Sequence, residues 1–180
     1  MTNNIKPAEK GLLIIYTGSG KGKTTAALGM ALRASGWKQK VAIIQFIKGF
    51  KETGEWKAIE ENPQIEIFQT FDDQKIAIGK PRREHQKAAE NAIKLARKII
   101  SEKKYNLVIL DEINNAIHYG LVEVGEIIKL GKEKPVEVSL VFTGRQAPKE
   151  LIQIADLVTE MKEIKHPFKK GISAKKGIDF

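Results

Sequence analysis

Residues 12–25 have the sequence Leu-Leu-Ile-Ile-Tyr-Thr-Gly-Ser-Gly-Lys-Gly-Lys-Thr-Thr, an apolar run followed by a loop rich in glycine and lysine. Glycine has no Cβ, so Gly18, Gly20 and Gly22 let the backbone turn tightly and direct N–H groups towards an anion. The helix expected to begin near Thr24 adds the N–H groups and the positive dipole of its N-terminus. The segment predicts a phosphate-binding loop between a strand and a helix. The alternative is a glycine-rich turn that binds no ligand.

Several residues of this loop have distinct expected roles. Lys23 can reach the outer phosphates of a nucleotide, and the Thr24 hydroxyl lies where such loops hold Mg²⁺. Lys21 adds a second positive charge, unless it is simply a solvated loop residue. The usual pattern, Gly-x4-Gly-Lys-Thr, would have its first glycine where this chain has Thr17. The loop residues expected to bind the nucleotide are Gly18, Ser19, Gly20, Lys21, Gly22, Lys23, Thr24 and Thr25.

The length of the chain fits one domain. With 180 residues and no cysteine, it is long enough to bury a core without disulfide bonds. Residues 1–10 are expected to form a polar N-terminal arm, and residues 11–180 a single nucleotide-binding domain. Neither a signal peptide nor an apolar stretch of membrane-spanning length is evident, which predicts a cytoplasmic protein that does not enter a membrane.

The net charge of +9 raises the possibility of a nucleic-acid partner. Part of the excess lies in residues 162–180, which contain six lysines and two acidic residues. Aromatic residues are sparse, however, and no basic stripe is interleaved with rings on which bases could stack. A positive field also suits a polyphosphate, so we favour that ligand over nucleic acid.

Strand and helix patterns alternate along the whole chain. Short apolar runs predict strands at 12–17, 41–47, 65–70, 107–110, 138–143 and 157–164. Helical patterns occupy 24–35, 54–61, 82–103, 114–119, 122–130 and 148–155. Nearly continuous apolar strands separated by amphipathic helices are typical of a parallel sheet covered on both faces. We therefore expect a three-layer α/β fold with a mainly parallel sheet of about six strands.

Ligands of such sheets bind at the carboxyl ends of the strands. The second strand ends in Gln45, Phe46 and Lys48, the fourth in Asp111 and Glu112, and the fifth in Thr143-Gly144-Arg145. These groups should meet the phosphate loop around one nucleotide.

The acidic pair predicts a metal site. Asp111 and Glu112 would lie opposite the Thr24 hydroxyl and could hold Mg²⁺ directly or through water. The alternative is that both residues cap the following helix. Arg145 could form a forked contact with phosphate oxygens, or pair with an acidic residue on the surface.

Other residue types give weaker indications. No two of His85, His118 and His166 have the spacing of metal ligands, and there is no cysteine to complete a zinc site, so we assign them no catalytic role. The phenylalanines of the second and third strands and of the segments after them could line an apolar pocket or simply pack in the core or a lid. They are Phe46, Phe50, Phe68 and Phe71.

Several segments together resemble one family, the P-loop type of ATP:cob(I)alamin (corrinoid) adenosyltransferases. The similarity covers essentially the whole chain after residue 10, and within this family Thr17 is a tolerated variant. The matching segments are Tyr-Thr-Gly-Ser-Gly-Lys-Gly-Lys-Thr-Thr-Ala-Ala at 16–27, Gln-Phe-Ile-Lys-Gly at 45–49, Leu-Asp-Glu at 110–112, Phe-Thr-Gly-Arg at 142–145, Ala-Asp-Leu-Val-Thr-Glu-Met at 155–161, Lys-His-Pro-Phe at 165–168 and Gly-Ile-Asp-Phe at 177–180.

The resemblance implies a RecA-like P-loop fold and transfer of the 5′-deoxyadenosyl group of ATP to the Co(I) centre of a reduced corrinoid, cobalamin or cobyrinic acid a,c-diamide. Triphosphate is released, and Mg²⁺ assists. The enzyme is implied to be a cytoplasmic homodimer that receives electrons from a reductase such as a flavoprotein. The basic segment 165–180 is expected to pack near the nucleotide or corrinoid.

The corrinoid contacts that follow from the resemblance are Phe46, Lys48, Phe71, His166 and Phe168. The similarity is weakest at 69–82, where family members have a Gly-Phe-x-Trp-like aromatic segment. This chain has Gln-Thr-Phe-Asp-Asp-Gln-Lys-Ile-Ala-Ile-Gly-Lys-Pro at 69–81 instead and keeps only Phe71 as an equivalent.

The implied chemistry needs no general base, because Co(I) is itself a strong nucleophile. The expected electrostatic catalysts are Lys21, Lys23 and Arg145, which would neutralise the departing triphosphate together with Mg²⁺ on Thr24, Asp111 and Glu112. Two other functions stay open: a P-loop ATPase or nucleotide kinase that cleaves the γ-phosphate, and a non-catalytic, nucleotide-dependent module that binds nucleic acid.

Overall fold

The computed structural model describes residues 10–47, 53–70 and 83–179 of the chain. In these residues six strands form one sheet in the order β3-β2-β4-β5-β1-β6, and every neighbouring pair is parallel. The strands are β1 (Leu13–Thr17), β2 (Val41–Gln45), β3 (Ile65–Gln69), β4 (Leu107–Asp111), β5 (Ser139–Thr143) and β6 (Leu157–Glu160). The helices are α1 (Lys23–Gly36), α2 (Gly54–Glu60), α3 (Arg83–Ser101), α4 (Ile113–His118), α5 (Val124–Glu133), α6 (Lys149–Ile154) and the 3₁₀ turn η2 (Pro167–Lys170).

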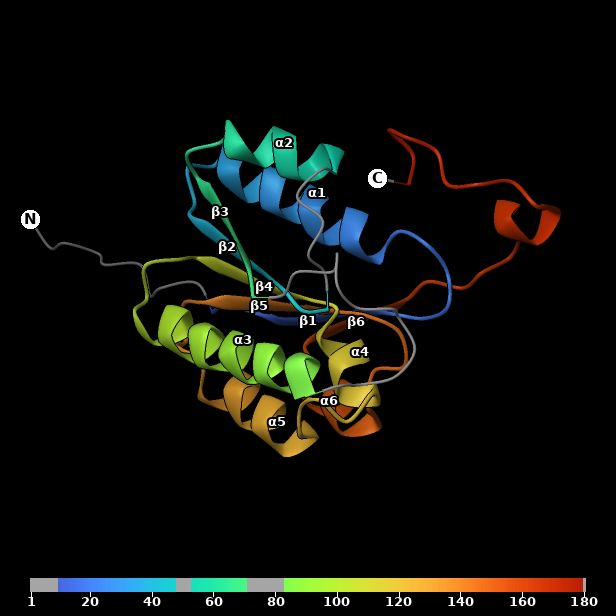
Figure 1. Cartoon of the computed structure of the whole chain (residues 1–180). Helices are drawn as coiled ribbons and strands as arrows, with labels where there is room; N and C mark the ends of the chain where they lie inside the picture. The colour runs from blue at the N-terminus through green and yellow to red at the C-terminus, as the bar shows by residue number, and fades with distance from the viewer. Residues whose placement is uncertain (1–9, 48–52, 71–82, 180) are drawn as a thin grey trace, which may run out of the picture.

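Helices cover both faces of the sheet. Figure 1 shows α1 and α2 on one face and α3, α4, α5 and α6 on the other. Alternate residues of β1 point into two separate cores: Leu13 and Ile15 pack towards α3 and α5, whereas Ile14 packs with Ala27 and Ala31 of α1. This arrangement explains why β2 and β4 are apolar over nearly their whole length and fully buried. The predicted three-layer α/β fold is confirmed.

The element boundaries differ from the predicted ones mainly at β6. The apolar pattern predicted a strand over 157–164, but β6 ends at Glu160. The Met161 N–H still donates to the carbonyl of Thr17, the last residue of β1, at 2.8 Å, whereas the Met161 carbonyl accepts from the Gly20 N–H of the phosphate loop at 2.7 Å. The strand therefore ends where its backbone begins to bond to the loop. Within the described residues, no helix is both long enough and apolar enough to cross a membrane.

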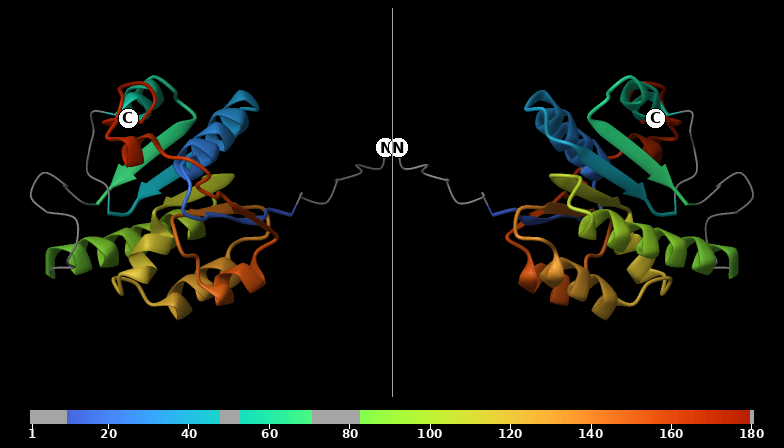
Figure 2. Two further views of the ribbon diagram at one scale, coloured as in Figure 1. Left: turned by 90° about the vertical axis from the view of Figure 1, so that its right-hand side faces the viewer. Right: turned by 90° about the vertical axis from the view of Figure 1, so that its left-hand side faces the viewer.

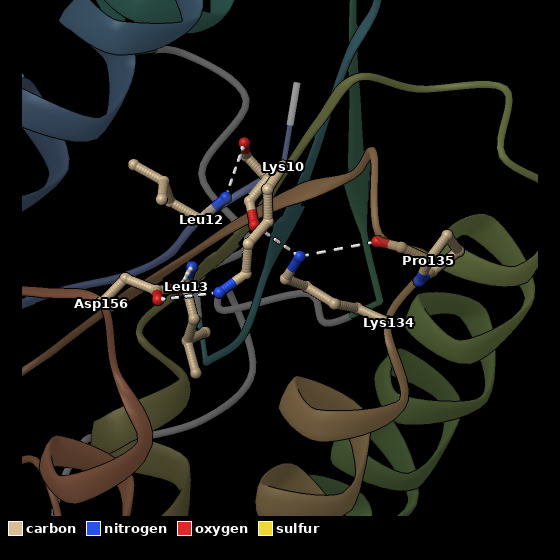
Figure 3. Close-up of polar contacts among 8 residues, drawn as sticks. Lys10, Leu12, Leu13, Lys134, Pro135 and Asp156 are labelled. Carbon is tan, nitrogen blue, oxygen red and sulfur yellow. Dashed lines mark hydrogen bonds and ion pairs between the residues drawn. The ribbon is translucent and has the colours of Figure 1, made fainter. Parts of the chain in front are cut away.

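Three charged side chains meet at the start of β1, as Figure 3 shows: Lys10, Lys134 and Asp156. The Leu13 N–H donates to Asp156 Oδ2 at 2.8 Å, and Lys10 pairs with the same carboxylate at 3.5 Å. The Lys134 ammonium donates to the Gly11 carbonyl at 2.7 Å, and burial lowers its pKa. A Cβ on Gly11 would lie 2.2 Å from the carbonyl oxygen of Val138, so only glycine fits at this approach. These contacts fix the register of the strand that delivers the phosphate loop.

We expect replacement of Asp156 by alanine to lower the free energy of unfolding at pH 7 by about 1–2 kcal/mol, because the Leu13 N–H loses a charged acceptor. The hydrogen bond from Leu13 and, to a smaller extent, the Lys10 ammonium lower the pKa of the Asp156 carboxyl. A lowered pKa in the folded state means that this contribution is fully present above the carboxyl's unfolded pKa and is lost as the pH falls through the folded value.

Urea denaturation of the wild type and Asp156→Ala between pH 7 and pH 2 measures this effect. Asp156→Asn retains an acceptor and should lose less stability than Asp156→Ala. A difference between the wild type and Asp156→Ala that stays constant down to pH 2 contradicts the assignment.

Candidate active site

The phosphate loop spans the end of β1 and the start of α1. Gly18 and Gly22 have φ values of 99° and 110°, a left-handed backbone that glycine adopts without strain. Gly22 is the N-cap of α1, and the first N–H to bond within the helix is that of Ala26, to the Gly22 carbonyl at 2.7 Å. The N–H groups of Lys23, Thr24 and Thr25 therefore belong to the helix terminus, where an anion is favoured.

The loop is packed against the segment that follows β6. A Cβ on Gly18 would lie 2.4 Å from the Met161 carbonyl oxygen, and one on Gly20 would lie 2.9 Å from Lys162 backbone atoms. The Gly20 N–H is bonded to Met161, so it is not directed at the concave side of the loop. Close packing against Met161 and Lys162 therefore requires glycine at positions 18 and 20, which the sequence pattern alone did not reveal.

Lys23 is held inside the loop and is 8% exposed. Its ammonium donates to the carbonyl oxygens of Gly18 at 2.9 Å and of Gly20 at 2.6 Å. These bonds place one positive charge at the centre of the loop, next to the helix N-terminus, where a phosphate oxygen would be attracted by both.

The carboxylate of Asp111 joins three strands and the loop. Its Oδ1 accepts from the hydroxyls of Thr24 at 3.0 Å and Thr143 at 2.6 Å, and its Oδ2 lies 3.5 Å from the Gln45 amide. The residue is 1% exposed. The carboxyl-end rule predicted this convergence of β2, β4 and β5 with the loop.

The donor set around Thr24 is suited to Mg²⁺. Mg²⁺ prefers oxygen ligands and is commonly held in nucleotide sites by a hydroxyl, one or two carboxylates, water and phosphate oxygens. The Thr24 hydroxyl, the Asp111 carboxylate behind it and Glu112 provide such oxygens. Among the described residues, no group of three or more His, Cys, Asp or Glu side chains forms a metal cluster, so the fit is to a nucleotide-bound ion rather than to a site built from protein ligands alone.

Glu112 and Arg145 follow β4 and β5 at the same edge. Glu112 has a φ of 64°, and its N–H donates to the Thr143 hydroxyl at 2.9 Å. The Arg145 N–H donates to the Asn115 amide oxygen at 2.6 Å, which anchors the backbone while the guanidinium stays exposed. Both side chains line the same cavity as the loop.

That cavity has a volume of about 740 Å³, within the range of small-molecule sites. Its polar end contains Gly20 to Thr25 with Glu112 and Arg145, so most of the predicted nucleotide-binding residues lie together. Gly18, Ser19 and Asp111 do not line the cavity; Gly18 and Asp111 are buried, and Ser19 is exposed. The predicted roles of these residues in binding and catalysis stay predictions.

The C-terminal segment forms another wall of the cavity. Residues 177–179 line it, and Asp179 pairs with Lys21 of the loop. Figures 1 and 2 show the end of the chain beside α2. Glu163 pairs with Lys169 at 2.5 Å, and this bond, with a smaller contribution from Arg145, lowers the pKa of Glu163. The role proposed for 165–180 near the nucleotide stays a prediction.

The predicted corrinoid contacts are less closely grouped. Phe46 is 1% exposed and packs in the core. Phe168 is 77% exposed on η2, where its N–H donates to His166 Nδ1 at 3.2 Å. Neither side chain lines the cavity. Lys48 and Phe71 lie outside the described residues, as does Phe50.

Sequence reasoning missed Asn115 and the pairing of Asp179 with Lys21. In the sequence, Asn114 and Asn115 indicated only the start of a helix. No local sequence pattern predicts that the Asn115 side chain accepts a hydrogen bond from the Arg145 backbone. The Gly-Ile-Asp-Phe segment was the one available signal for Asp179.

The fold and this site define the chain as a P-loop nucleotide-binding protein of the α/β class. A family model described as "ATP:corrinoid adenosyltransferase BtuR/CobO/CobP" matches residues 9–180. The chain therefore belongs to the ATP:corrinoid adenosyltransferase family.

Curated relatives agree with this assignment. A corrinoid adenosyltransferase of Sinorhizobium sp. is 42% identical over 97% of this chain and 83% of its own length. Corrinoid adenosyltransferases of Pseudomonas aeruginosa and Escherichia coli K12 are 37% and 34% identical, each over 96% of this chain and over 85% and 87% of their own lengths.

Proposed function

We propose that this protein transfers the 5′-deoxyadenosyl group of ATP to the Co(I) centre of a reduced corrinoid and releases triphosphate. Family membership supports the reaction. The structural support is one cavity that is lined by the phosphate loop, Glu112 and Arg145 and is large enough for a nucleotide. The bond from cobalt to C5′ forms as the bond from C5′ to the triphosphate oxygen breaks, and Co(I) supplies both electrons.

The protein's part in this reaction is alignment and charge neutralisation. Lys23 would bind a phosphate oxygen from within the loop, with the N–H groups of Thr24 and Thr25 beside it. Lys21 and Arg145 would stabilise the growing negative charge of the leaving triphosphate. No proton has to be removed from the nucleophile, so no general base is required.

Mg²⁺ would be held by Thr24, with Asp111 orienting the threonine hydroxyl and Glu112 at the cavity wall. Bound there, it would neutralise triphosphate charge. Asp111 accepts hydrogen bonds from two hydroxyls, so its expected contact with the ion is through Thr24 or water.

The remaining properties are proposals that rest on the family. The corrinoid is cobalamin or cobyrinic acid a,c-diamide, bound with the help of Phe46, Lys48, Phe71, His166 and Phe168. The protein acts as a cytoplasmic homodimer, and a reductase such as a flavoprotein supplies the electrons that form Co(I). Residues 11–180 form the catalytic domain behind the arm at 1–10.

Incubation with ATP, Mg²⁺ and chemically reduced cobalamin tests the proposal. The visible spectrum should change to that of an alkylated cobalt, and triphosphate should accumulate in equal amount. ADP and phosphate as products would instead identify an ATPase or kinase. Binding of nucleic acid that weakens steeply with salt, without corrinoid turnover, would identify the binding module.

Removal of residues 164–180 is expected to lower kcat/KM for ATP at least tenfold, because one wall of the cavity and the partner of Lys21 are lost. The fold should persist, since Met161 and Lys162 still pack against the loop glycines. Steady-state kinetics and circular dichroism of the shortened chain measure both. Removal of residues 1–9 provides the control. Unchanged activity after loss of 164–180 contradicts a role for the segment at the site.

A further inference from the structure

Residues 144–147, here called the arginine segment, lie between β5 and α6 and bring Arg145 to the wall of the cavity. Their backbone is unusual, because Gly144 has a φ of 128° and Gln146 a φ of 53°. Glycine adopts a left-handed backbone without strain, whereas glutamine does so only where surrounding contacts hold it. The position of Arg145 therefore depends on the contacts that hold this segment from outside.

The start of α4 holds one side of the arginine segment. The Arg145 N–H donates to the Asn115 amide oxygen at 2.6 Å, and the Asn114 amide donates to the Gly144 carbonyl at 3.4 Å. A Cβ on Gly144 would lie 2.9 Å from the Asn114 Cβ and 3.0 Å from the Asn115 nitrogen, so the segment lies directly against this helix. These contacts all act on the residues before Gln146.

Thr17 holds the other side of the arginine segment. It is the last residue of β1 and is 7% exposed, and its hydroxyl accepts a hydrogen bond from the Ala147 N–H at 3.1 Å. The bond joins the residue directly before the phosphate loop to a residue 130 positions later in the chain. Asn115 and Thr17 therefore bind the N–H groups on either side of the strained Gln146.

Thr17 also lies where the usual phosphate-loop pattern has its first glycine. Glycine has no side chain and could not accept this hydrogen bond. Thr17 has an ordinary strand backbone, so a side chain at this position costs no backbone strain. The departure from the usual pattern supplies a hydroxyl that connects the phosphate loop to the arginine segment.

We propose that Thr17 and Asn115 are positioning residues, which fix the arginine segment relative to the phosphate loop so that the Arg145 guanidinium reaches the triphosphate. The role of Arg145 in this proposal rests on the proposed function. Arginine loses considerable side-chain freedom when it binds, and a backbone that is already fixed lowers the remaining entropic cost. Neither Thr17 nor Asn115 has to touch the ligand, because both act through Arg145.

Thr17→Val removes the hydroxyl and keeps the shape of the side chain. It should lower kcat for adenosyl transfer about five- to tenfold and change KM for ATP less than about twofold. The fall is expected in kcat because the triphosphate gains charge as it leaves, so a displaced guanidinium costs most in the transition state. Asn115→Ala should act in the same direction. Thr17→Ser retains the hydroxyl and should restore kcat to within about twofold of the wild type.

A double-mutant cycle with Arg145→Ala separates positioning from a general structural role. Arg145→Ala alone should lower kcat about tenfold or more. In that background Thr17→Val and Asn115→Ala should each change kcat less than about twofold, because no guanidinium is left to displace. A structural role of Thr17 alone would lower kcat by the same factor whether or not Arg145 is present.

Calorimetric binding of inorganic triphosphate repeats the cycle without turnover, with a ligand that carries the charge of the leaving group. Thr17→Val should weaken this binding about threefold when Arg145 is present and leave it unchanged when residue 145 is alanine.

Ser139→Ala is the matched control. The Ser139 hydroxyl accepts from the Leu12 N–H at 3.2 Å, so the same kind of bond connects the chain beside β1 to β5 at the opposite edge of the sheet. Urea denaturation should show a lower free energy of unfolding for this variant, as for Thr17→Val. Its kcat should equal that of the wild type, because the bond lies far from the cavity.

Two results would overturn the proposal. One is a kcat and a triphosphate affinity of Thr17→Val within about twofold of the wild type. The other is an equal loss caused by Thr17→Val in the presence and absence of Arg145. Failure of the proposed function is distinct: the wild type then forms no alkylated corrinoid, while Thr17 and Arg145 remain coupled in triphosphate binding.

Discussion

Lys23→Ala should lower kcat/KM for ATP by about 10²–10³-fold, the usual cost of removing one preorganised charge from a site where negative charge develops. Lys23 is 8% exposed and its ammonium is held by two loop carbonyls, so the charge that is lost is oriented and partly shielded from water. The fall should appear in kcat as well as in KM, because the triphosphate gains charge as it leaves.

Single-turnover spectroscopy with reduced cobalamin measures the chemical step directly. Lys129→Ala is a suitable control, because Lys129 pairs with Glu133 and both side chains are exposed. They belong to α5, which covers the other face of the sheet. It should behave like the wild type. Near-normal turnover by Lys23→Ala would refute the role given to this lysine.

Gly18→Ala should destabilise the protein by about 2–4 kcal/mol, the sum of a left-handed backbone at a residue with a Cβ and of an overpacked contact. The new Cβ would lie 2.4 Å from the Met161 carbonyl oxygen and 2.7 Å from the Met161 nitrogen. These are backbone atoms bonded to Thr17 and Gly20, so they cannot move without disturbing the loop. Affinity for ATP should therefore fall together with stability.

Denaturant unfolding and calorimetric ATP binding test both expectations. Gly120→Ala separates the two causes, since Gly120 has a φ of 69° but nothing lies within 4 Å of its Cβ position. It should cost about 1–2 kcal/mol from backbone strain alone and leave ATP binding intact. If Gly18→Ala and Gly120→Ala lower the free energy of unfolding by the same amount, the contact with Met161 does not contribute to the destabilisation.

Much of the fold followed from local pattern. The strands are short apolar runs and the long helix repeats its buried residues at helical spacing, because a sheet covered on both faces needs both features. The order of the strands could not be predicted from these patterns, since nothing in a buried run such as Leu107–Leu110 specifies its neighbours. The shortened β6 was missed for a similar reason: its end is decided by hydrogen bonds to Thr17 and Gly20, far away in the sequence.

Part of the candidate site could likewise be predicted from the sequence, and part could not. The meeting of Asp111, Thr143 and the loop was predictable, because the carboxyl ends of parallel strands share one edge. The contact of Asp179 with Lys21 was not, since no periodicity links residues so far apart.

The position of β1 has a consequence for the order of events on the ribosome. This strand emerges early, yet both of its neighbours come late: Leu13 aligns with Leu140 of β5, and Ile14 with Leu157 of β6. At typical elongation rates the nascent strand waits roughly 7–30 s for those partners. Until then its apolar residues have no sheet to join, which makes the unfinished polypeptide a natural client for chaperones that shield exposed segments during translation.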